Sequence, residues 1–148
     1  MKPFIPPPIV ALLCGLGIYF TRRYFPFTLG AYTSYLGLLF LVSGILMLFF
    51  AAVSFRKHKT TINPLKPDAA SYLVTSGVFK ISRNPMYLGM LLILIGIAVY
   101  FNPIGGCLIC FIFWGFITKF QILPEEVAMQ KLFTKEFSIY SNKTRRWL

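Results

Sequence analysis

Long uncharged stretches dominate the pattern of hydrophobic and polar positions along the chain. Of the 148 residues, three stretches contain no Asp, Glu, Lys or Arg, and they cover residues 3–21, 24–55 and 84–118. A membrane-spanning helix needs roughly 20 apolar residues. The first two stretches therefore each predict one transmembrane helix.

The third stretch is too long for a single crossing. As one helix, residues 84–118 would extend about 52 Å at 1.5 Å per residue. Asn102-Pro103 interrupts the stretch near its middle, and proline both removes a helical donor and restricts the residue before it. We therefore predict two crossings, at about 85–101 and 104–122, joined as a tight hairpin. The chain then has four membrane spans.

Composition and charge agree with a membrane protein. The chain is 57% hydrophobic and 13% charged, and a soluble domain of this length cannot bury so much apolar surface. Only Arg22 and Arg23 fall on one predicted side of the membrane. The other side receives Lys2, the basic residues of the loop at 56–84 and those from residue 119 onward. The loop carries Arg56, Lys57, Lys59, Lys66, Lys80 and Arg83, and the later segment carries Lys119, Lys131, Lys135, Lys143, Arg145 and Arg146.

The basic residues predict the orientation of the chain. Cytoplasmic loops carry the excess of Lys and Arg, so both termini and the loop at 56–84 are predicted to be cytoplasmic. The net charge of +11 is explained by this bias together with contact to anionic lipids, and we expect no nucleic-acid partner. The amino-terminal segment has no small-residue cleavage site, which predicts a retained span rather than a signal peptide.

The cysteines predict no metal or redox site. Cys14, Cys107 and Cys110 all fall inside predicted spans. The CxxC spacing of the last two is a weak signal without further ligands, and buried cysteines behave as small hydrophobic residues. His58 lies in a basic run and is interpreted as a solvated residue. We therefore predict no metal ligands.

Two segments outside the spans hold most of the polar chemistry. In the loop at 56–84, Asn63-Pro64 and Lys66-Pro67 favour an irregular, extended path. In the second segment, Pro124 suits a first helical turn, with Glu125 and Glu126 beside the positive helix end. Helical spacing then predicts one amphipathic helix whose apolar face carries Met129, Leu132, Phe133, Phe137 and Tyr140.

A helical hairpin brings the ends of these segments together. Taken singly, the Glu pair only complements a helix dipole, and Lys80 and Arg83 only mark the membrane interface. Together, residues 84–87 and 121–126 meet at one membrane face. Acid, amide, cation and aromatic groups then lie above a lipid-lined cleft. Such a site suits a zwitterionic cofactor and a greasy substrate that enters from the bilayer.

The ordered set LVTSGVF, RNPMYLG, PEE and RRW resembles the isoprenylcysteine carboxyl methyltransferase family. The resemblance runs from about Lys59 to Leu148. It is closest to the small bacterial members and extends more distantly to phosphatidylethanolamine N-methyltransferases. It implies an S-adenosylmethionine-dependent membrane methyltransferase without a Rossmann fold, acting on a lipophilic small-molecule or lipid substrate. It also implies a multi-pass location in the bacterial inner membrane.

Carried over by position, the resemblance implies the cofactor contacts. They are Leu73, Val74, Phe79, Asn84, Pro85, Met86, Tyr87 and Glu125, and the chemistry of the ligand adds Arg83 to the candidate cofactor contacts. Phe79 and the Leu73-Val74 backbone suit adenine, and Glu125 suits the methionine ammonium. The methionine carboxylate needs donors, which Asn84 and Arg83 offer.

Two further residues are assigned to catalysis. Gln121 falls near the position where prenylcysteine enzymes carry an Arg that meets the substrate carboxylate. A neutral amide pairs poorly with a carboxylate, so prenylcysteine is not the expected acceptor. Glu126 is the nearest candidate base if the acceptor is an amine or a hydroxyl. Asn84 and Ser71 also stand where the eukaryotic enzymes carry His.

The sequence thus predicts an all-α, integral membrane bundle of four transmembrane helices, with a cytoplasmic loop and a carboxy-terminal amphipathic helix. One membrane domain covers 1–148, with two amino-terminal spans in 1–55 and a cofactor-binding methyltransferase core in 56–148. Two alternatives stay open. One is a non-catalytic small membrane protein, and the other is a nicotinamide-dependent membrane reductase of related fold.

Overall fold

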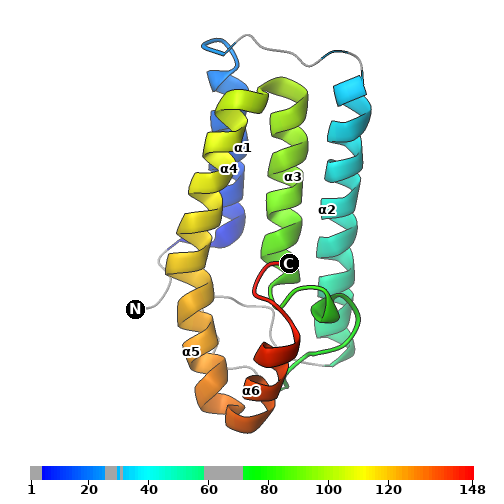
Figure 1. Cartoon of the computed structure of the whole chain (residues 1–148), viewed down its shortest axis with the longest axis vertical. Coiled ribbons are helices and arrows are strands. Elements are labelled where there is room, and N and C mark those ends of the chain that lie inside the picture. The colour runs from blue at the N-terminus through cyan, green and yellow to red at the C-terminus, as the bar shows by residue number, and fades with distance from the viewer. Residues whose placement is uncertain (1–4, 26–29, 31, 59–71) are drawn as a thin grey trace.

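The computed structural model describes residues 5–25, 30, 32–58 and 72–148, and this part of the chain contains helices and no strand. Four long helices stand side by side (Figure 1). They are α1 (Pro7–Thr21), α2 (Tyr32–Lys57), α3 (Pro85–Phe101) and α4 (Pro103–Ile117). At the lower end lie a 3-10 helix, Gly77–Lys80, and two shorter helices, α5 (Leu123–Leu132) and α6 (Thr134–Lys143). The all-α prediction is confirmed.

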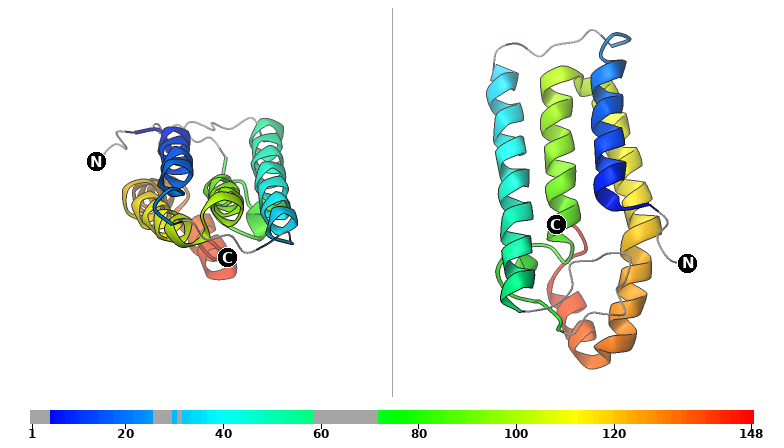
Figure 2. Two further views of the ribbon diagram at one scale, coloured as in Figure 1. Left: turned by 90° about the horizontal axis from the view of Figure 1, so that it is seen from above. Right: turned by 180° about the vertical axis from the view of Figure 1, so that it is seen from behind.

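Helix α3 occupies the middle of the bundle. Seen from above, it lies between α2 on one side and α1 and α4 on the other (Figure 2). Its inward positions are correspondingly buried, with Leu94 only 1% exposed. The main hydrophobic core joins α3 to its neighbours through fully buried side chains, among them Ile18, Phe113, Ile117 and Ile122.

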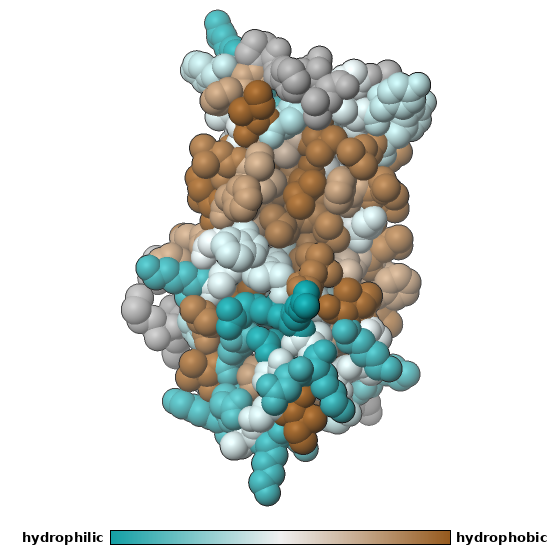
Figure 3. All heavy atoms as spheres, in the orientation of Figure 1, coloured by the Kyte–Doolittle hydropathy of each residue, from teal (hydrophilic) through white to brown (hydrophobic). Residues whose placement is uncertain are grey.

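The outer surface of the bundle is apolar. Figure 3 shows a broad hydrophobic band around the long helices and hydrophilic residues gathered at the lower end. Large side chains such as Leu12, Leu39 and Phe111 are more than half exposed. Two helices of the described chain are long and apolar enough to cross a membrane, Tyr32–Lys57 and the continuous helix Pro103–Leu132. Helices α1 and α3 are shorter apolar helices, so the count of four spans stays a prediction.

The predicted hairpin break is confirmed at Asn102-Pro103. Asn102 is fully buried, and its Oδ1 accepts a hydrogen bond from the Gly105 backbone N–H at 2.9 Å, which caps α4. Its Nδ2 donates to Thr21 Oγ1 at 3.1 Å, at the end of α1. One side chain therefore stops α3, starts α4 and attaches α1 to the turn.

The prediction of a separate amphipathic helix that starts at Pro124 is wrong. A π-helical turn, Thr118–Ile122, runs directly from α4 into α5, and the Leu123 N–H donates to the Thr118 carbonyl five residues back. A proline ring clashes with the carbonyl four residues before it in an α-helix. The wider turn relieves that clash and lets the helix continue. The helix breaks instead at Phe133, and α6 begins at Thr134.

Part of the predicted cytoplasmic loop cannot be compared with the structure. Lys59, Asn63-Pro64, Lys66-Pro67 and Ser71 lie outside the described residues. The described part of that loop packs beneath α2, where Val74 and Phe79 are buried with Ala51.

Candidate functional site

A cluster around one carboxylate joins α3 to the π-helical turn. Tyr87 donates its hydroxyl to Glu125 Oε1 at 2.6 Å, and Gln121 Nε2 donates to the same oxygen at 2.5 Å. Tyr87 and Gln121 are 7% and 2% exposed. We call Tyr87, Gln121 and Glu125 the carboxylate cluster. The extra residue of the π-turn changes the phase of the helix, and Gln121 and Glu125 are thereby directed toward α3.

The acid of the carboxylate cluster, Glu125, has only neutral hydrogen-bond partners among the residues that the structure describes. Glu125 forms no salt bridge with any residue of the described chain. Its Oε2 atom takes part in neither of the two hydrogen bonds above. A carboxylate removed from bulk water is stabilised by a cation. The cluster is therefore suited to receive a positively charged group.

Glu126, the next residue, has a different environment. Its Oε1 accepts from Arg83 Nη2 at 2.6 Å, and its Oε2 accepts from Arg146 Nη2 at 2.7 Å. A third bond, from Arg146 Nε, measures 3.0 Å. We call Arg83, Glu126 and Arg146 the arginine clamp. The hydrogen bonds to Glu126 raise the pKa of Arg146. Because the helix does not begin at Pro124, Glu126 does not lie at a free helix end. Its carboxylate is stabilised by the two arginines of the clamp.

The segment 145–147, which we call the strap, lies across the start of α3. The Arg83 N–H donates to the Arg145 carbonyl at 3.0 Å. The Arg146 carbonyl accepts from Asn84 Nδ2 at 3.0 Å and from Ser82 Oγ at 3.2 Å. Sequence reasoning missed this role of Ser82 and Arg146. The closing RRW was noted only as part of a motif, and contacts across some sixty residues leave no local pattern.

A second hydrophobic cluster lies beside the clamp. It contains Val74 and Phe79 with Phe137 and Tyr140, and Leu73 and Met86 pack against it. The Phe79 ring meets Phe55 edge to face at 5.2 Å. Tyr140 donates its hydroxyl to the Phe79 carbonyl at 2.6 Å, and burial raises the pKa of Tyr140. The residues predicted to hold adenine are thus together, in a packed apolar environment.

One buried donor in this region has no partner. Within the described residues, Arg83 Nε is the only buried side-chain polar atom without a hydrogen bond. A buried N–H without an acceptor costs about 1–3 kcal/mol, so an added acceptor would be stabilising. A ligand carboxylate supplies such an acceptor, and Glu125 is suited to a ligand ammonium. The donor set therefore fits the zwitterionic end of an amino acid.

The predicted site residues thus divide between two neighbouring groups. Pro85 begins α3 and sets the start of the helix that carries Tyr87. Leu73, Val74, Phe79 and Met86 belong to the hydrophobic cluster. The remaining predicted residues lie in the carboxylate cluster, the arginine clamp or the strap contacts, namely Arg83, Asn84, Tyr87, Gln121, Glu125 and Glu126.

Comparison with known proteins gives one family and several distant relatives. The family model described as phospholipid methyltransferase matches residues 32–136. A probable protein-S-isoprenylcysteine O-methyltransferase of Oryza sativa subsp. indica is 27% identical over 118 residues, which are 79% of this chain and 61% of the rice protein. The protein-S-isoprenylcysteine O-methyltransferase of Saccharomyces cerevisiae is 33% identical over 79 residues, or 53% of this chain and 33% of the yeast protein.

A further relative is an uncharacterized protein of Haemophilus influenzae, which is 38% identical over 63 residues. The match covers 43% of this chain and 100% of that protein. The chain spans about three-fifths of the length of the rice relative and about one-third of the yeast one. No solved structure matches the chain significantly.

Proposed function

Because the chain belongs to the phospholipid methyltransferase family, we propose that it is an integral membrane methyltransferase that uses S-adenosylmethionine to methylate a lipophilic acceptor in the bilayer. The observation that carries the proposal is the pair of complementary buried groups at one end of the bundle. Glu125 is an acid with neutral partners only, and Arg83 Nε is a donor without an acceptor among the described residues.

The residues at this end support a place for each part of the cofactor. Glu125 would hold the ammonium and Arg83 Nε the carboxylate of the methionine portion. Asn84 Nδ2 donates to the Arg146 carbonyl. We therefore propose that Asn84 holds the strap in place at the edge of the cofactor site. Phe79, Val74 and Leu73 offer the apolar surface that adenine requires.

When bound, S-adenosylmethionine supplies an electrophilic methyl group on a positively charged sulfur. The protein residues then have two tasks, which are to align the acceptor with that methyl group and to exclude water. The carboxylate cluster is suited to both, because Tyr87 and Gln121 are buried and hold Glu125 in a fixed position. No nucleophilic side chain of the protein is needed.

Glu126 is less suited to act as a base than its position in the sequence suggests. Both of its oxygens accept charged hydrogen bonds in the arginine clamp. Such bonds stabilise the carboxylate and oppose its protonation. We propose that Glu126 anchors the clamp and that the acceptor reacts through a group that needs no base, a carboxylate or a thiolate.

Gln121 bears on the identity of the acceptor. It is 2% exposed and donates to Glu125, so no cation stands at this position to meet a substrate carboxylate. We propose that prenylcysteine is not the preferred acceptor. Acetyl-farnesyl-cysteine should be methylated poorly by the purified protein, and efficient turnover would contradict this assignment.

We also propose four spans, with the carboxylate cluster, the clamp and both termini on the cytoplasmic side. The basic residues at the lower end support this orientation. Reporter fusions after Lys80 and after Leu148 should both report cytoplasm, and a fusion after Arg23 should report the opposite side. A cytoplasmic signal at Arg23 would remove the four-span assignment.

The decisive experiment follows the methyl group. Membranes that contain the protein are incubated with methyl-labelled S-adenosylmethionine, and the lipids are extracted and separated. We expect label in one lipophilic fraction, and we expect S-adenosylhomocysteine to suppress it. Membranes with the Glu125→Gln variant serve as the control. A scaffold protein would give no label, and a nicotinamide-dependent reductase would respond to neither compound.

A further inference from the structure

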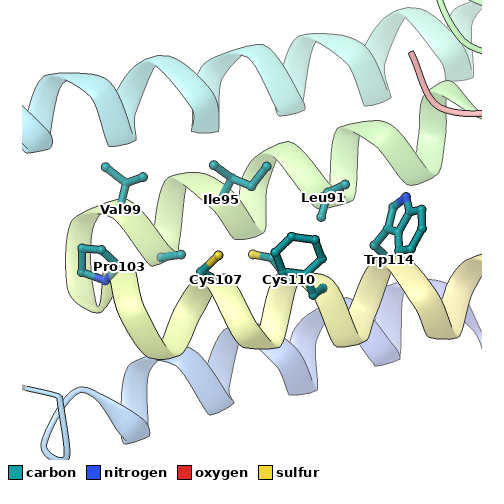
Figure 4. Close-up of a pocket in the computed structure, with 9 residues that line it drawn as sticks. Leu91, Ile95, Val99, Pro103, Cys107, Cys110 and Trp114 are labelled. Carbon is teal, nitrogen blue, oxygen red and sulfur yellow. The ribbon is translucent and has the colours of Figure 1, made fainter.

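An apolar cavity of about 470 Å³ opens between α3 and α4, and Figure 4 shows its lining. Binding sites for small molecules usually measure about 300–1,000 Å³, so this volume is enough for a ligand. From α3 the cavity is lined by Leu91, Ile95 and Val99, and from α4 by Pro103, Cys107 and Trp114.

The lining restricts the chemistry of the ligand. All of the lining residues fall in the uncharged stretch 84–118, and none of their side chains carries a charge. A water molecule needs two to four polar partners to be held in place, and this lining does not supply them. The ligand for this cavity is therefore a hydrocarbon chain and not a headgroup.

The lower end of the cavity lies one helical turn from the carboxylate cluster. Leu91 lies one helical turn beyond Tyr87 on α3, so the two side chains are neighbours on the same side of the helix. On the facing helix, Thr118 donates to the Trp114 carbonyl at 2.6 Å and accepts from Trp147 Nε1 at 3.1 Å. The strap is thereby attached beside the end of the cavity that is nearest to Glu125.

We propose that this cavity holds the hydrocarbon chain of the methyl acceptor, with the reactive head at the lower end of the cavity, facing the cofactor site, and the chain directed toward Pro103. The assignment rests on the proposed methyltransferase function, since it takes the head to be the methylated group. From Leu91 to Val99 the helix rises about 12 Å. The cavity therefore accommodates about 12 Å of an extended hydrocarbon chain.

Intrinsic fluorescence tests occupancy directly, because the chain has two tryptophans. In the Trp147→Phe variant, Trp114 is the single reporter, and it lines the cavity. Titration in detergent with 2-bromododecanoic acid, whose bromine lies beside the head and thus at the Trp114 end of the cavity, should quench this fluorescence saturably. Cys107→Phe in the same background should weaken that binding about tenfold, since the added ring fills the cavity.

Two further variants control for general effects of a new aromatic ring. Leu108→Phe adds the same ring to the same helix at a residue that is 63% exposed, and it should leave the quenching unchanged. Val99→Phe blocks only the far end. It should weaken binding of 2-bromododecanoic acid and leave binding of the shorter 2-bromohexanoic acid unaffected. Quenching that does not saturate, or that all three variants change equally, overturns the proposal.

The same variants connect the cavity to the reaction. Cys107→Phe should keep the unmodified affinity for S-adenosylhomocysteine, which also reports that it folds, and should lower label transfer into the lipid fraction about tenfold. Unchanged label transfer would mean that the cavity holds a bystander lipid, and it would overturn the proposal. If the unmodified protein fails to bind S-adenosylhomocysteine, the proposed function itself fails, and the quenching shows separately whether the cavity binds a chain.

Discussion

Helix α3 packs differently against α2 and against α4. Against α2 the backbones touch, because Gly44 and Gly37 face Gly89 and Gly96, and a Cβ at Gly44 would lie 2.6 Å from the Gly89 carbonyl oxygen. Against α4 the contact is tight at the upper turn, where a Cβ at Gly106 would overlap the Ala98 Cβ, and below that turn the two helices leave a cavity of about 470 Å³. Small residues allow close approach of helices in membranes.

The contrast separates a structural contact from a ligand-binding one. The glycine contact holds α3 in one position, so the α3–α4 side has a fixed wall against which a chain can lie. That second side is closed at its upper end by the contact of Gly106 with Ala98, and at its lower end Tyr87 and Glu125 are joined by a 2.6 Å hydrogen bond. The polar closure and the cavity above it thus lie on the same side of α3, away from the glycine contact.

The largest expected effect is on the glycine contact. Gly44→Ala should destabilise the protein by about 3 kcal/mol, because the new methyl group overlaps the Gly89 carbonyl and the Ile93 side chain. The matched control is Gly115→Ala in α4, where a Cβ meets nothing within 4 Å. Thermal unfolding in detergent, followed by circular dichroism, measures both. Equal stability of the two variants would mean that the α2–α3 contact is not tight.

Glu125→Gln tests the polar closure of the open side. Loss of a charged hydrogen bond to the cofactor ammonium costs about 1.5–3 kcal/mol. This variant should therefore bind S-adenosylhomocysteine roughly 10- to 150-fold more weakly. Its stability should change little, since a glutamine carbonyl still accepts from Tyr87 and Gln121. Isothermal titration measures the affinity, and an unchanged affinity would exclude Glu125 from the cofactor site.

These contacts show how far the sequence alone could go. Asn102-Pro103 predicted the hairpin correctly, because a break of that kind is local and proline chemistry is strict. The glycines recur seven residues apart in both α2 and α3, so that signal was present, although it does not reveal the partner helix. The prediction at Pro124 was wrong because proline is compatible with two structures. It is common in the first turn of a helix, and it is also tolerated directly after a π-turn inside a continuous helix.

The candidate site was predicted only in part, because some of its contacts follow from local hairpin geometry and others depend on tertiary structure. The meeting of 84–87 with 121–126 follows from hairpin geometry, and the structure brings Tyr87, Gln121 and Glu125 into contact. Whether Glu125 or Glu126 meets arginine could not be predicted. That distinction depends on the phase change at the π-turn and on the return of Arg146, and both are tertiary features.

Glu126→Gln tests the arginine clamp, which supports the closure from outside. Breaking a buried ion pair costs about 3–5 kcal/mol, but the Arg146 side chain is 37% exposed, so we expect about 2 kcal/mol of lost stability. Glu136→Gln, at an exposed position in α6, should cost less than about 0.5 kcal/mol. S-adenosylhomocysteine binding by Glu126→Gln should fall much less than for Glu125→Gln. A loss of affinity as large as that of Glu125→Gln would contradict the separation of the two acids.

The smallest effect concerns the attachment of the strap beside the cavity. Trp147 Nε1 donates to Thr118 Oγ1 at 3.1 Å, and a bond of this kind contributes about 1 kcal/mol. Trp147→Phe and Thr118→Val should each cost about that amount, and the double variant should cost no more than either, which gives a coupling of about 1 kcal/mol. The control cycle pairs Thr118→Val with Trp114→Phe. Thr118 contacts the carbonyl of Trp114 and not its indole nitrogen, so that cycle should show no coupling. Equal coupling in both cycles, measured by unfolding in detergent, would mean that the strap is not attached through this bond and that the lower end of the cavity is open.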